Sequence, residues 1–237
     1  MANDFFKFKQ FTIHQEHAAF RITTDSVLLG AWADLDGVQH ILDVGTGTGI
    51  LALMAAQRCD ASVVALEPDR NSFMQAGLNI TVSPWSERIT LFNRTLHEFS
   101  GETTYLFDTI ITNPPFFNAT LPNPDARKAA TRHSLTLTHD ALLEASLQLL
   151  APAGTLQLVL PVNEAIQFAA LARASGLQCW RKLSVRPMPE LPPARMLMTL
   201  GRLERGCEES VIVLEKGGRH VYSDEYVSLT KDFYLKF

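Results

Sequence analysis

Short hydrophobic runs of strand length alternate with longer segments of helical periodicity along most of the chain. The predicted strands lie at residues 40–44, 62–67, 89–92, 108–112 and 155–160. The predicted helices lie at residues 50–56, 69–78, 139–150 and 163–175. Strands that alternate with helices are typical of a parallel sheet whose crossover helices cover its faces. The pattern therefore predicts an α/β protein.

The last third of the chain has a different pattern. Residues 178–186, 196–203 and 210–215 have strand composition, but no helical segment separates them. The proline-rich stretch 187–193 is predicted to be a loop between two of these strands. Strands joined by short connections pair antiparallel. This region is therefore predicted to form antiparallel strands at the edge of the sheet.

Composition agrees with a soluble globular protein of 237 residues, with 46% hydrophobic and 19% charged residues. The net charge is -4, so an RNA partner would require a local basic face. The three cysteines are far apart in sequence and lack metal-ligand spacing, so we expect no metal site. We expect a cytoplasmic location and no membrane segment, because the start "MANDFFKFKQF" lacks the apolar region of a signal peptide.

The first chemical motif is "DVGTGTG" at residues 43–49, between a predicted strand and a predicted helix. Glycines at such a turn let a ligand approach the backbone and the N–H groups of the helix. A dinucleotide site would need the spacing G-x-G-x-x-G, whereas the glycines here are spaced G-x-G-x-G. Glu67 ends the next strand, where a carboxylate can accept hydrogen bonds from ribose hydroxyls. The motif resembles the S-adenosylmethionine site of Rossmann-like methyltransferases.

The second motif is "IITNPPFF" at residues 110–117. Two prolines stop the strand ladder, so the strand is predicted to end at Asn113. The stretch resembles the [Asn/Asp]-Pro-Pro-aromatic signature of methyltransferases that act on planar nitrogen. In such a site Asn113 and the Pro114 carbonyl would accept from the target amine, and Phe116 would stack on its ring. The alternative is an ordinary turn that ends a strand.

Nearly the whole chain resembles the bacterial tRNA adenosine N6-methyltransferases that modify a valine tRNA beside its anticodon. The specific segments are "FKFKQFTIHQEHAAFRITTDSVLLGAW" at residues 6–32, the neighbourhood of Arg132 and His133, and the terminal "DFYLKF". Two positions depart from the family pattern. Phe116 replaces the more usual tyrosine, and Thr95 stands where many relatives have an aspartate that binds the cofactor adenine.

The resemblance implies a Rossmann-like class I fold, with a mostly parallel seven-stranded sheet and an antiparallel edge strand. It implies one methyltransferase domain, with an N-terminal extension and lid at 1–35, a core at 36–216 and a packed tail at 217–237. The implied cofactor is S-adenosylmethionine, and the implied substrate is tRNA bound by a monomer. The expected cofactor-binding residues are Thr24, Asp25, Asp43, Gly45, Thr46, Gly47, Gly49, Glu67, Pro68, Asn93, Thr95 and Asn113.

Two groups of residues are candidates for RNA contacts. The expected RNA-binding residues are Lys7, Lys9, Arg127, Lys128, Arg132 and His133. The N-terminal phenylalanines that alternate with the two lysines could stack on RNA, or they could belong to an edge strand. A second basic set comprises Arg181, Lys182, Arg186 and Arg195, and scattered charges of this kind usually form a solvated face. The residues 23–25 could cover the methionine end of the cofactor, or they could simply cap a helix.

Other functions remain as alternatives. A protein-glutamine methyltransferase uses the same Asn-Pro-Pro chemistry. Enzymes of that kind carry an N-terminal helical domain before the glycine motif, whereas only about 40 residues precede the motif here. A DNA adenine methyltransferase usually adds a target-recognition domain. A non-catalytic RNA-binding protein of this fold is the alternative without enzymatic activity.

Overall fold

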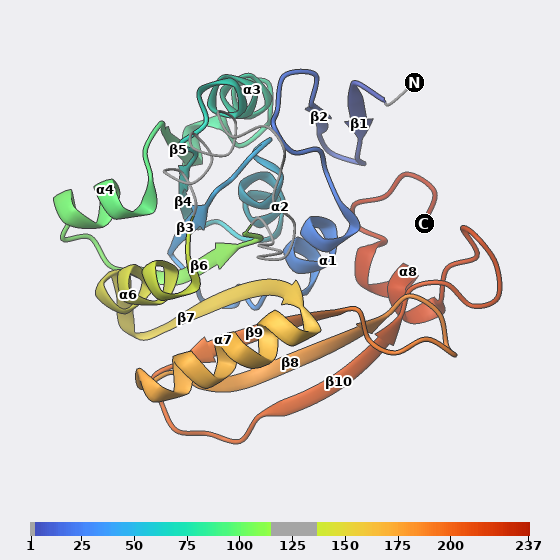
Figure 1. Cartoon of the computed structure of the whole chain (residues 1–237). Coiled ribbons are helices and arrows are strands. Elements are labelled where there is room, and N and C mark those ends of the chain that lie inside the picture. Colours follow the sequence, from blue (N-terminus) through green and yellow to red (C-terminus); the bar gives the residue numbers. More distant parts are fainter. Residues whose placement is uncertain (1–2, 115–136) are drawn as a thin grey trace, which may run out of the picture.

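The computed structural model describes residues 3–114 and 137–237, and it confirms the α/β class. At its centre is an eight-stranded sheet with helices on both faces (Figure 1). The strands of this sheet are β3 (His40–Val44), β4 (Ser62–Leu66), β5 (Ile89–Phe92), β6 (Phe107–Thr112), β7 (Leu150–Pro161), β8 (Gln178–Arg186), β9 (Arg195–Gly201) and β10 (Glu208–Val213). The helices are α1 (Thr24–Trp32), α2 (Ile50–Arg58), α3 (Arg70–Thr81), α4 (Leu96–Glu102), α6 (His139–Leu149), α7 (Val162–Ala174), α8 (Asp224–Thr230) and the short 3-10 helix η1 (Ser86–Arg88).

The strand order is β10-β8-β9-β7-β6-β3-β4-β5, which corrects the predicted sheet in two respects. The described sheet has eight strands instead of seven. Its antiparallel strand is the internal β9, which pairs with both β7 and β8, while the edge strand β10 runs parallel to β8. The short loop after β8 returns β9 in the opposite direction, as predicted. The pairing of β9 with β7 joins segments distant in sequence, so local pattern could not place β9 inside the sheet.

Alternate residues of the central strands pack into two hydrophobic clusters, one on each face of the sheet. Ile41 and Ile111 belong to the cluster formed with α1, α2 and α3. Leu42 and Ile110 belong to the cluster formed with α4, α6 and α7. This alternation follows from the two-residue period of a strand. Because both faces are buried, the strands contain continuous apolar runs, as in other parallel sheets.

The two ends of the chain pack against each other. Strands β1 (Phe5–Lys7) and β2 (Thr12–His14) form a separate antiparallel pair, and Phe8 bridges to Tyr234. The Lys9 ammonium donates to the carbonyls of Lys231 and Phe237, at 2.6 and 2.8 Å. Phe8 and Phe11 are buried in the same cluster as the C-terminal aromatic residues. These two phenylalanines are therefore structural and do not form a surface for stacking on RNA.

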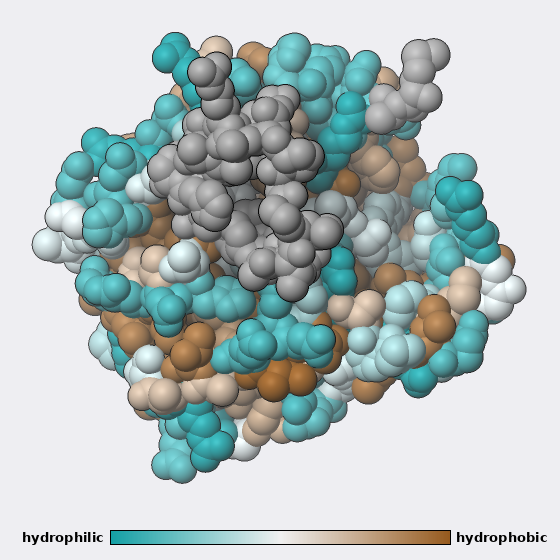
Figure 2. Space-filling model, viewed as in Figure 1, coloured by the Kyte–Doolittle hydropathy of each residue, from teal (hydrophilic) through white to brown (hydrophobic). Residues whose placement is uncertain are grey.

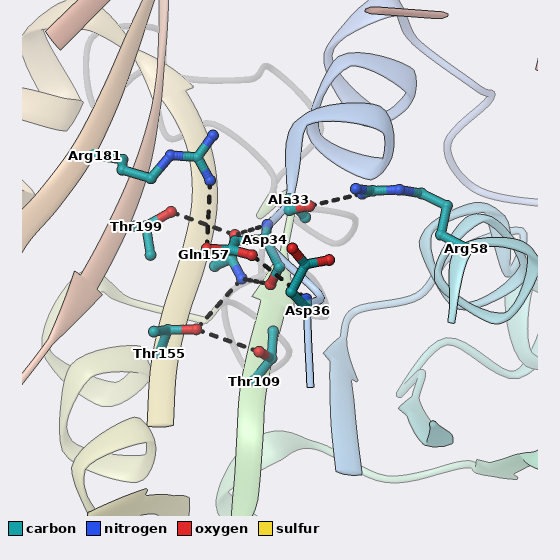
Figure 3. Close-up of polar contacts among 9 residues, drawn as sticks. All are labelled: Ala33, Asp34, Asp36, Arg58, Thr109, Thr155, Gln157, Arg181 and Thr199. Atoms are coloured by element: carbon teal, nitrogen blue, oxygen red, sulfur yellow. Dashed lines mark hydrogen bonds and ion pairs between the residues drawn. The ribbon is translucent and has the colours of Figure 1, made fainter. Parts of the chain in front are cut away.

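A polar network joins the segment after α1 to β7 and β9 within the sheet (Figure 3). The Gln157 side chain accepts from the Asp34 backbone N–H at 2.8 Å and donates to the Asp34 carbonyl at 2.7 Å. Thr199 donates to the same Gln157 carbonyl oxygen. Arg181 contacts the Asp34 carboxylate at 3.7 Å and lies over the Trp32 ring. The connection between α1 and β3 is thus fixed to β7 and β9.

Several element boundaries differ from the predicted ones. β7 begins at Leu150, earlier than the predicted residue 155, and its register with β6 shifts between Phe107 and Thr109. The sequence Ala-Pro-Ala-Gly at 151–154 therefore lies within an irregular strand. Helix α4 was not predicted, although its Thr95 and Glu98 form a reciprocal capping box.

The face of the molecule in Figure 2 shows hydrophilic and hydrophobic residues mixed together. The hydrophobic side chains of Ile166 and Leu171, on α7, are exposed. In residues 3–114 and 137–237, no helix has the length and apolar character needed to cross a membrane. Over the same residues, there is no group of three or more side chains suited to hold a metal ion.

Candidate active site

The candidate active site lies at the carboxyl ends of β3, β4 and β6. Strand β3 lies between the other two, so the glycine loop that follows it adjoins both. The Thr46 backbone N–H donates to the Leu66 carbonyl at 2.9 Å, which joins the loop to β4. Thr112 donates its hydroxyl to the Val44 carbonyl at 2.8 Å, which joins β6 to β3. The structure therefore brings together the two sequence motifs, which were identified separately.

The glycine loop has a backbone that requires glycine and leaves open space beside it. Gly45, Gly47 and Gly49 have φ angles of +69°, +60° and +86°. A Cβ atom at Gly45 or Gly47 would meet no heavy atom within 4 Å. Residues with side chains rarely adopt such angles, so the loop conformation depends on glycine. Gly49 then caps the amino end of α2.

Asp43 lies beneath the glycine loop and holds it in place. Its side chain is fully buried, and one carboxylate oxygen accepts from the Thr46 hydroxyl at 2.5 Å and the Ala52 backbone N–H at 3.0 Å. The other oxygen, Oδ1, is buried and has no hydrogen-bond partner among residues 3–114 and 137–237. Burial raises the pKa of Asp43 from 3.8 to about 7, despite the two hydrogen bonds and with a small contribution from the charge of Glu67.

We expect Asp43 to make the stability of the protein depend on pH. Because its pKa is raised in the folded state, its stabilising contribution is complete below about pH 4 and is lost as the pH rises to about 7. Relative to Asp43→Asn, the wild-type free energy of unfolding should therefore fall across this range, by as much as about 4 kcal/mol. Urea unfolding of both proteins at several pH values measures this difference. Parallel pH profiles would contradict a raised pKa at Asp43.

Glu67 connects the end of β4 to the glycine loop. One of its carboxylate oxygens accepts from the Gly47 backbone N–H at 2.8 Å, and the other accepts from the Asp69 N–H at 2.9 Å. Burial raises the pKa of Glu67, although these two hydrogen bonds oppose the shift. The Asn93 side chain donates to the carbonyls of Glu67 and Pro68, at 2.8 and 3.0 Å. Each Glu67 oxygen retains a lone pair for a further donor.

Two more of the expected cofactor-binding residues, Thr95 and Asn93, have structural partners. The Thr95 hydroxyl caps α4 and accepts from the Glu98 backbone N–H at 3.2 Å. The Asn93 side chain is exposed, and its amide group orients the backbone that follows β4. Contacts of these two residues with a cofactor remain predictions.

Asn113 and Pro114 follow the last residue of β6. The Asn113 side chain is partly exposed and forms no hydrogen bond with the described residues. Pro114 is buried, which limits the freedom of the backbone beside it. The predicted end of the strand at Asn113 is one residue beyond its observed end at Thr112. The third predicted catalytic residue, Phe116, lies outside the described residues.

The first residues of α1 lie at the same end of the sheet as the candidate active site. Thr23 is the N-cap of the helix and forms a reciprocal capping box with Ser26, which confirms the capping interpretation for this position. Asp25 lies in the first turn of α1 and accepts from Arg195 Nε at 2.8 Å. Because Arg195 begins β9, this ion pair joins α1 to the middle of the sheet.

A polar face of α3 near the site was missed from the sequence. Ser72, Gln75 and Asn79 are at most 2% exposed, and each accepts from a backbone N–H of the segment 14–19. Asn79 also donates to the Thr48 carbonyl at 2.9 Å and to the His14 carbonyl at 2.8 Å. These contacts fix the N-terminal segment against the glycine loop. The i, i+3, i+7 spacing of these polar residues, which puts them on one face of α3, could have predicted this polar contact surface.

The predicted RNA-binding residues are not gathered into one described surface. Lys7 lies on β1, and Lys9 holds the C-terminal carbonyls. Arg127, Lys128, Arg132 and His133 lie outside the described residues. The second basic set has partners: Arg181 contacts Asp34, Lys182 contacts Glu209, Arg186 donates to the Leu191 carbonyl, and Arg195 contacts Asp25.

Comparison with known proteins agrees with this geometry. The family model described as "Methyltransferase small domain" matches residues 17–174. A relative from Bacteroides fragilis is 43% identical over 237 residues, and one from Trichodesmium erythraeum is 41% identical over 241 residues, with both chains covered completely in each case. Both relatives are named tRNA1(Val) (adenine(37)-N6)-methyltransferase. The chain belongs to this methyltransferase family.

Solved structures show the same fold at lower identity. A protein from Agrobacterium tumefaciens described as a predicted O-methyltransferase has a TM-score of 0.67 at 20% identity, and the match covers 88% of this chain and 96% of that one. The ribosomal protein L11 methylase of Lactobacillus delbrueckii has a TM-score of 0.57 at 15% identity, with 84% and 100% covered. These likenesses confirm the class I methyltransferase fold that was predicted.

Proposed function

We propose that this protein transfers a methyl group from S-adenosylmethionine to N6 of an adenosine in the anticodon loop of a valine tRNA. The main support is that the glycine loop, Glu67 and Asn113-Pro114 meet at one sheet edge, in a chain that matches relatives of that name over its whole length. The relatives' name specifies adenine 37 of tRNA1(Val). A tRNA substrate also implies a cytoplasmic location.

The residues at the glycine loop fit S-adenosylmethionine. The space beside Gly45 and Gly47 would be filled by any Cβ, and the buried Asp43 Oδ1 is an acceptor with no partner in the described part of the chain. Glu67 has acceptor capacity for two ribose hydroxyls and is already oriented by two backbone N–H groups. When bound, the cofactor supplies an electrophilic methyl group on sulfur. Asp25, which is paired with Arg195, and Thr24 beside it would cover the methionine end.

Asn113 and Pro114 would act on the target amine. The exocyclic nitrogen of adenine is a weak nucleophile because its lone pair is delocalised into the ring. The Asn113 side-chain oxygen and the Pro114 carbonyl can both accept from the amino group and hold it with its lone pair out of conjugation. Such fixed acceptors contribute through position and orientation and do not need a strong base. Phe116 would stack on the ring of the target base.

Methyl transfer from labelled S-adenosylmethionine to an unmodified valine tRNA transcript, followed by nucleoside analysis, tests this function. We expect N6-methyladenosine, with the label lost when the adenine at position 37 is replaced by guanine. Duplex DNA and a protein with an exposed glutamine serve as alternative acceptors. Label in either of these, and none in tRNA, would contradict the proposal.

We expect tRNA binding to weaken strongly with salt although the protein has a net charge of -4. A basic patch must displace counterions from phosphates, so each neutralised phosphate adds roughly 0.7 to 0.9 to the slope of log K against log salt concentration. Charge reversal at Arg127 and Lys128 should reduce this slope and leave the affinity for S-adenosylhomocysteine unchanged. Binding titrations at several salt concentrations measure the slope, and an unchanged slope would place the basic surface elsewhere.

A further inference from the structure

A cavity lies at the same sheet edge as the candidate active site. It has a volume of about 250 Å³ and is lined by Thr24, Pro187, Leu214, Glu215, His220, Tyr222 and Tyr226. We call these residues the edge pocket. Pro187 follows β8 and Leu214 follows β10, and both strands run parallel to β6. The edge pocket therefore opens at the carboxyl edge where the glycine loop and Asn113 lie.

The edge pocket shares a wall with the candidate active site. Thr24, which lines it, is the first residue of α1 and precedes Asp25, whose partner Arg195 begins β9. Along the sheet, β6 is separated from β8 by β7 and β9. The strand registers place Thr112 level with Lys182, five residues before Pro187. Three strand spacings of about 4.8 Å across the sheet, combined with the offset of about 3.3 Å per residue along β8, give roughly 20 Å between the Asn113 end of β6 and the pocket. A nucleic-acid strand bound at Asn113 can therefore extend to the edge pocket.

A short hairpin builds the outer rim of the edge pocket. Glu215 bridges to Tyr222, and the Lys216 N–H donates to the Val221 carbonyl at 2.8 Å. Within it His220 has a φ angle of +66°, the one positive φ outside glycine in the described residues. The Glu215 carboxylate accepts from the His220 backbone N–H at 2.8 Å and holds this conformation. Strained residues held in this way occur mostly at functional sites.

The side chains of the edge pocket suit a flat heterocycle with N–H donors. Tyr222 is half-buried, and its ring packs on the rings of Tyr226 and Phe237, with centroids 5.1 and 5.3 Å away. His220 is exposed, and its Nδ1 lies 3.2 Å from the Tyr222 hydroxyl oxygen. As far as the described residues form it, the lining contains a carboxylate, Glu215, and neither lysine nor arginine. A phosphate would be repelled there, whereas a base amino group could donate to the carboxylate.

From these observations, and resting on the proposed tRNA substrate, we infer that the edge pocket receives an unstacked nucleobase of the anticodon loop near the target adenosine. The base would stack on Tyr222 and His220, and an amino or imino group on its edge would donate to Glu215. Adenine, cytosine and guanine carry an amino donor, and guanine and uracil carry an imino donor. Single-stranded nucleic acid is commonly bound by stacking of its bases on aromatic side chains.

Direct binding tests the inference independently of methyl transfer. Fluorescence anisotropy would measure binding of an unmodified valine tRNA transcript, with S-adenosylhomocysteine present, to wild type and to Tyr222→Ala. We expect the variant to bind about 5- to 100-fold more weakly, from the usual contribution of one stacked base. Tyr105→Ala, at the opposite sheet edge and 46% exposed, is the matched control and should bind normally.

Transcripts with one abasic nucleotide identify the base that enters the edge pocket. Each anticodon-loop position is made abasic in turn. We expect one abasic transcript to bind the wild type weakly. Its affinity should not fall further when Tyr222→Ala replaces the wild type. The assignment would be overturned if Tyr222→Ala lowered the affinity for every abasic transcript equally, or lowered it for none of them.

His220→Gly separates a binding role from a structural one, in case Tyr222→Ala unfolds. Glycine tolerates a φ of +66°, so this variant should keep or raise the melting temperature while binding the transcript more weakly. Unchanged binding by His220→Gly would overturn the contact with His220. If the wild type methylates the tRNA and the pocket variants bind it normally, the base-binding role of the edge pocket is wrong and the proposed function stands. If binding depends on the pocket but no methylation occurs, the proposed function is wrong and the base-binding role stands.

Discussion

Replacing Asn113 with alanine is expected to lower the single-turnover rate of methyl transfer by about 100- to 1,000-fold, the usual cost of losing one preorganised hydrogen-bonding group. Asn113 directly follows β6, its side chain is partly exposed, and it hydrogen-bonds to none of the described residues. Removal of the Asn113 side chain should therefore leave no hydrogen-bonding group of the described residues without its partner. Thr112, which joins β6 to β3, is untouched by the change. The fold and the cofactor site should remain intact.

Single-turnover assays with saturating cofactor and tRNA measure this effect without contributions from binding or product release. The affinity for S-adenosylhomocysteine, measured by calorimetry, should change less than twofold. Asn71→Ala, an exposed asparagine on α3, provides the matched control and should react at the wild-type rate. A near-normal rate for Asn113→Ala would show that "IITNPPFF" only ends a strand.

Replacing Glu67 with alanine is expected to weaken S-adenosylhomocysteine binding by roughly 10- to 100-fold. Each hydrogen bond from a ribose hydroxyl to this carboxylate should contribute about 1 kcal/mol, and as much as about 3 kcal/mol for a charged acceptor. The same change leaves the N–H groups of Gly47 and Asp69 without their acceptors, so the glycine loop also loses a support. Both effects weaken binding of the cofactor.

Glu67→Gln distinguishes these two effects. Glutamine keeps the shape of the side chain and one acceptor oxygen, but its amide nitrogen cannot accept from a second donor. We expect this variant to show an intermediate affinity by calorimetry. The exposed Glu87→Ala is the control for loss of a glutamate and should bind normally. Unchanged affinity in Glu67→Ala would exclude Glu67 from the cofactor site.

Part of the site could be predicted because its signals are local. The glycines of residues 45–49 follow a strand and precede a helix, and their observed φ angles are those that only glycine adopts readily. The two prolines after Asn113 mark the end of β6, since proline cannot donate to a strand ladder. The alternation of strands and helices likewise determined the α/β class. These features depend on residues close together in sequence.

The sequence alone could not show how the side chains of the site are paired. Asp43, Thr95 and Lys9 were expected to contact cofactor or RNA, and the structure gives each a partner within the protein. Carboxylates, hydroxyls and ammonium groups can bind a ligand or the protein's own backbone equally well, so residue type does not distinguish these roles. Only the folded chain brings a particular acceptor or donor within reach.

Tertiary structure also decided which distant segments meet. The place of β9 between β7 and β8, the contacts of Asn79 with residues 14 and 48, and the edge pocket each join parts of the chain far apart in sequence. Hydrophobic period and turn residues specify an element and its buried face, but they do not identify its neighbour. The sequence by itself thus determined the fold class and the two motifs, and long-range packing determined how they combine into one site.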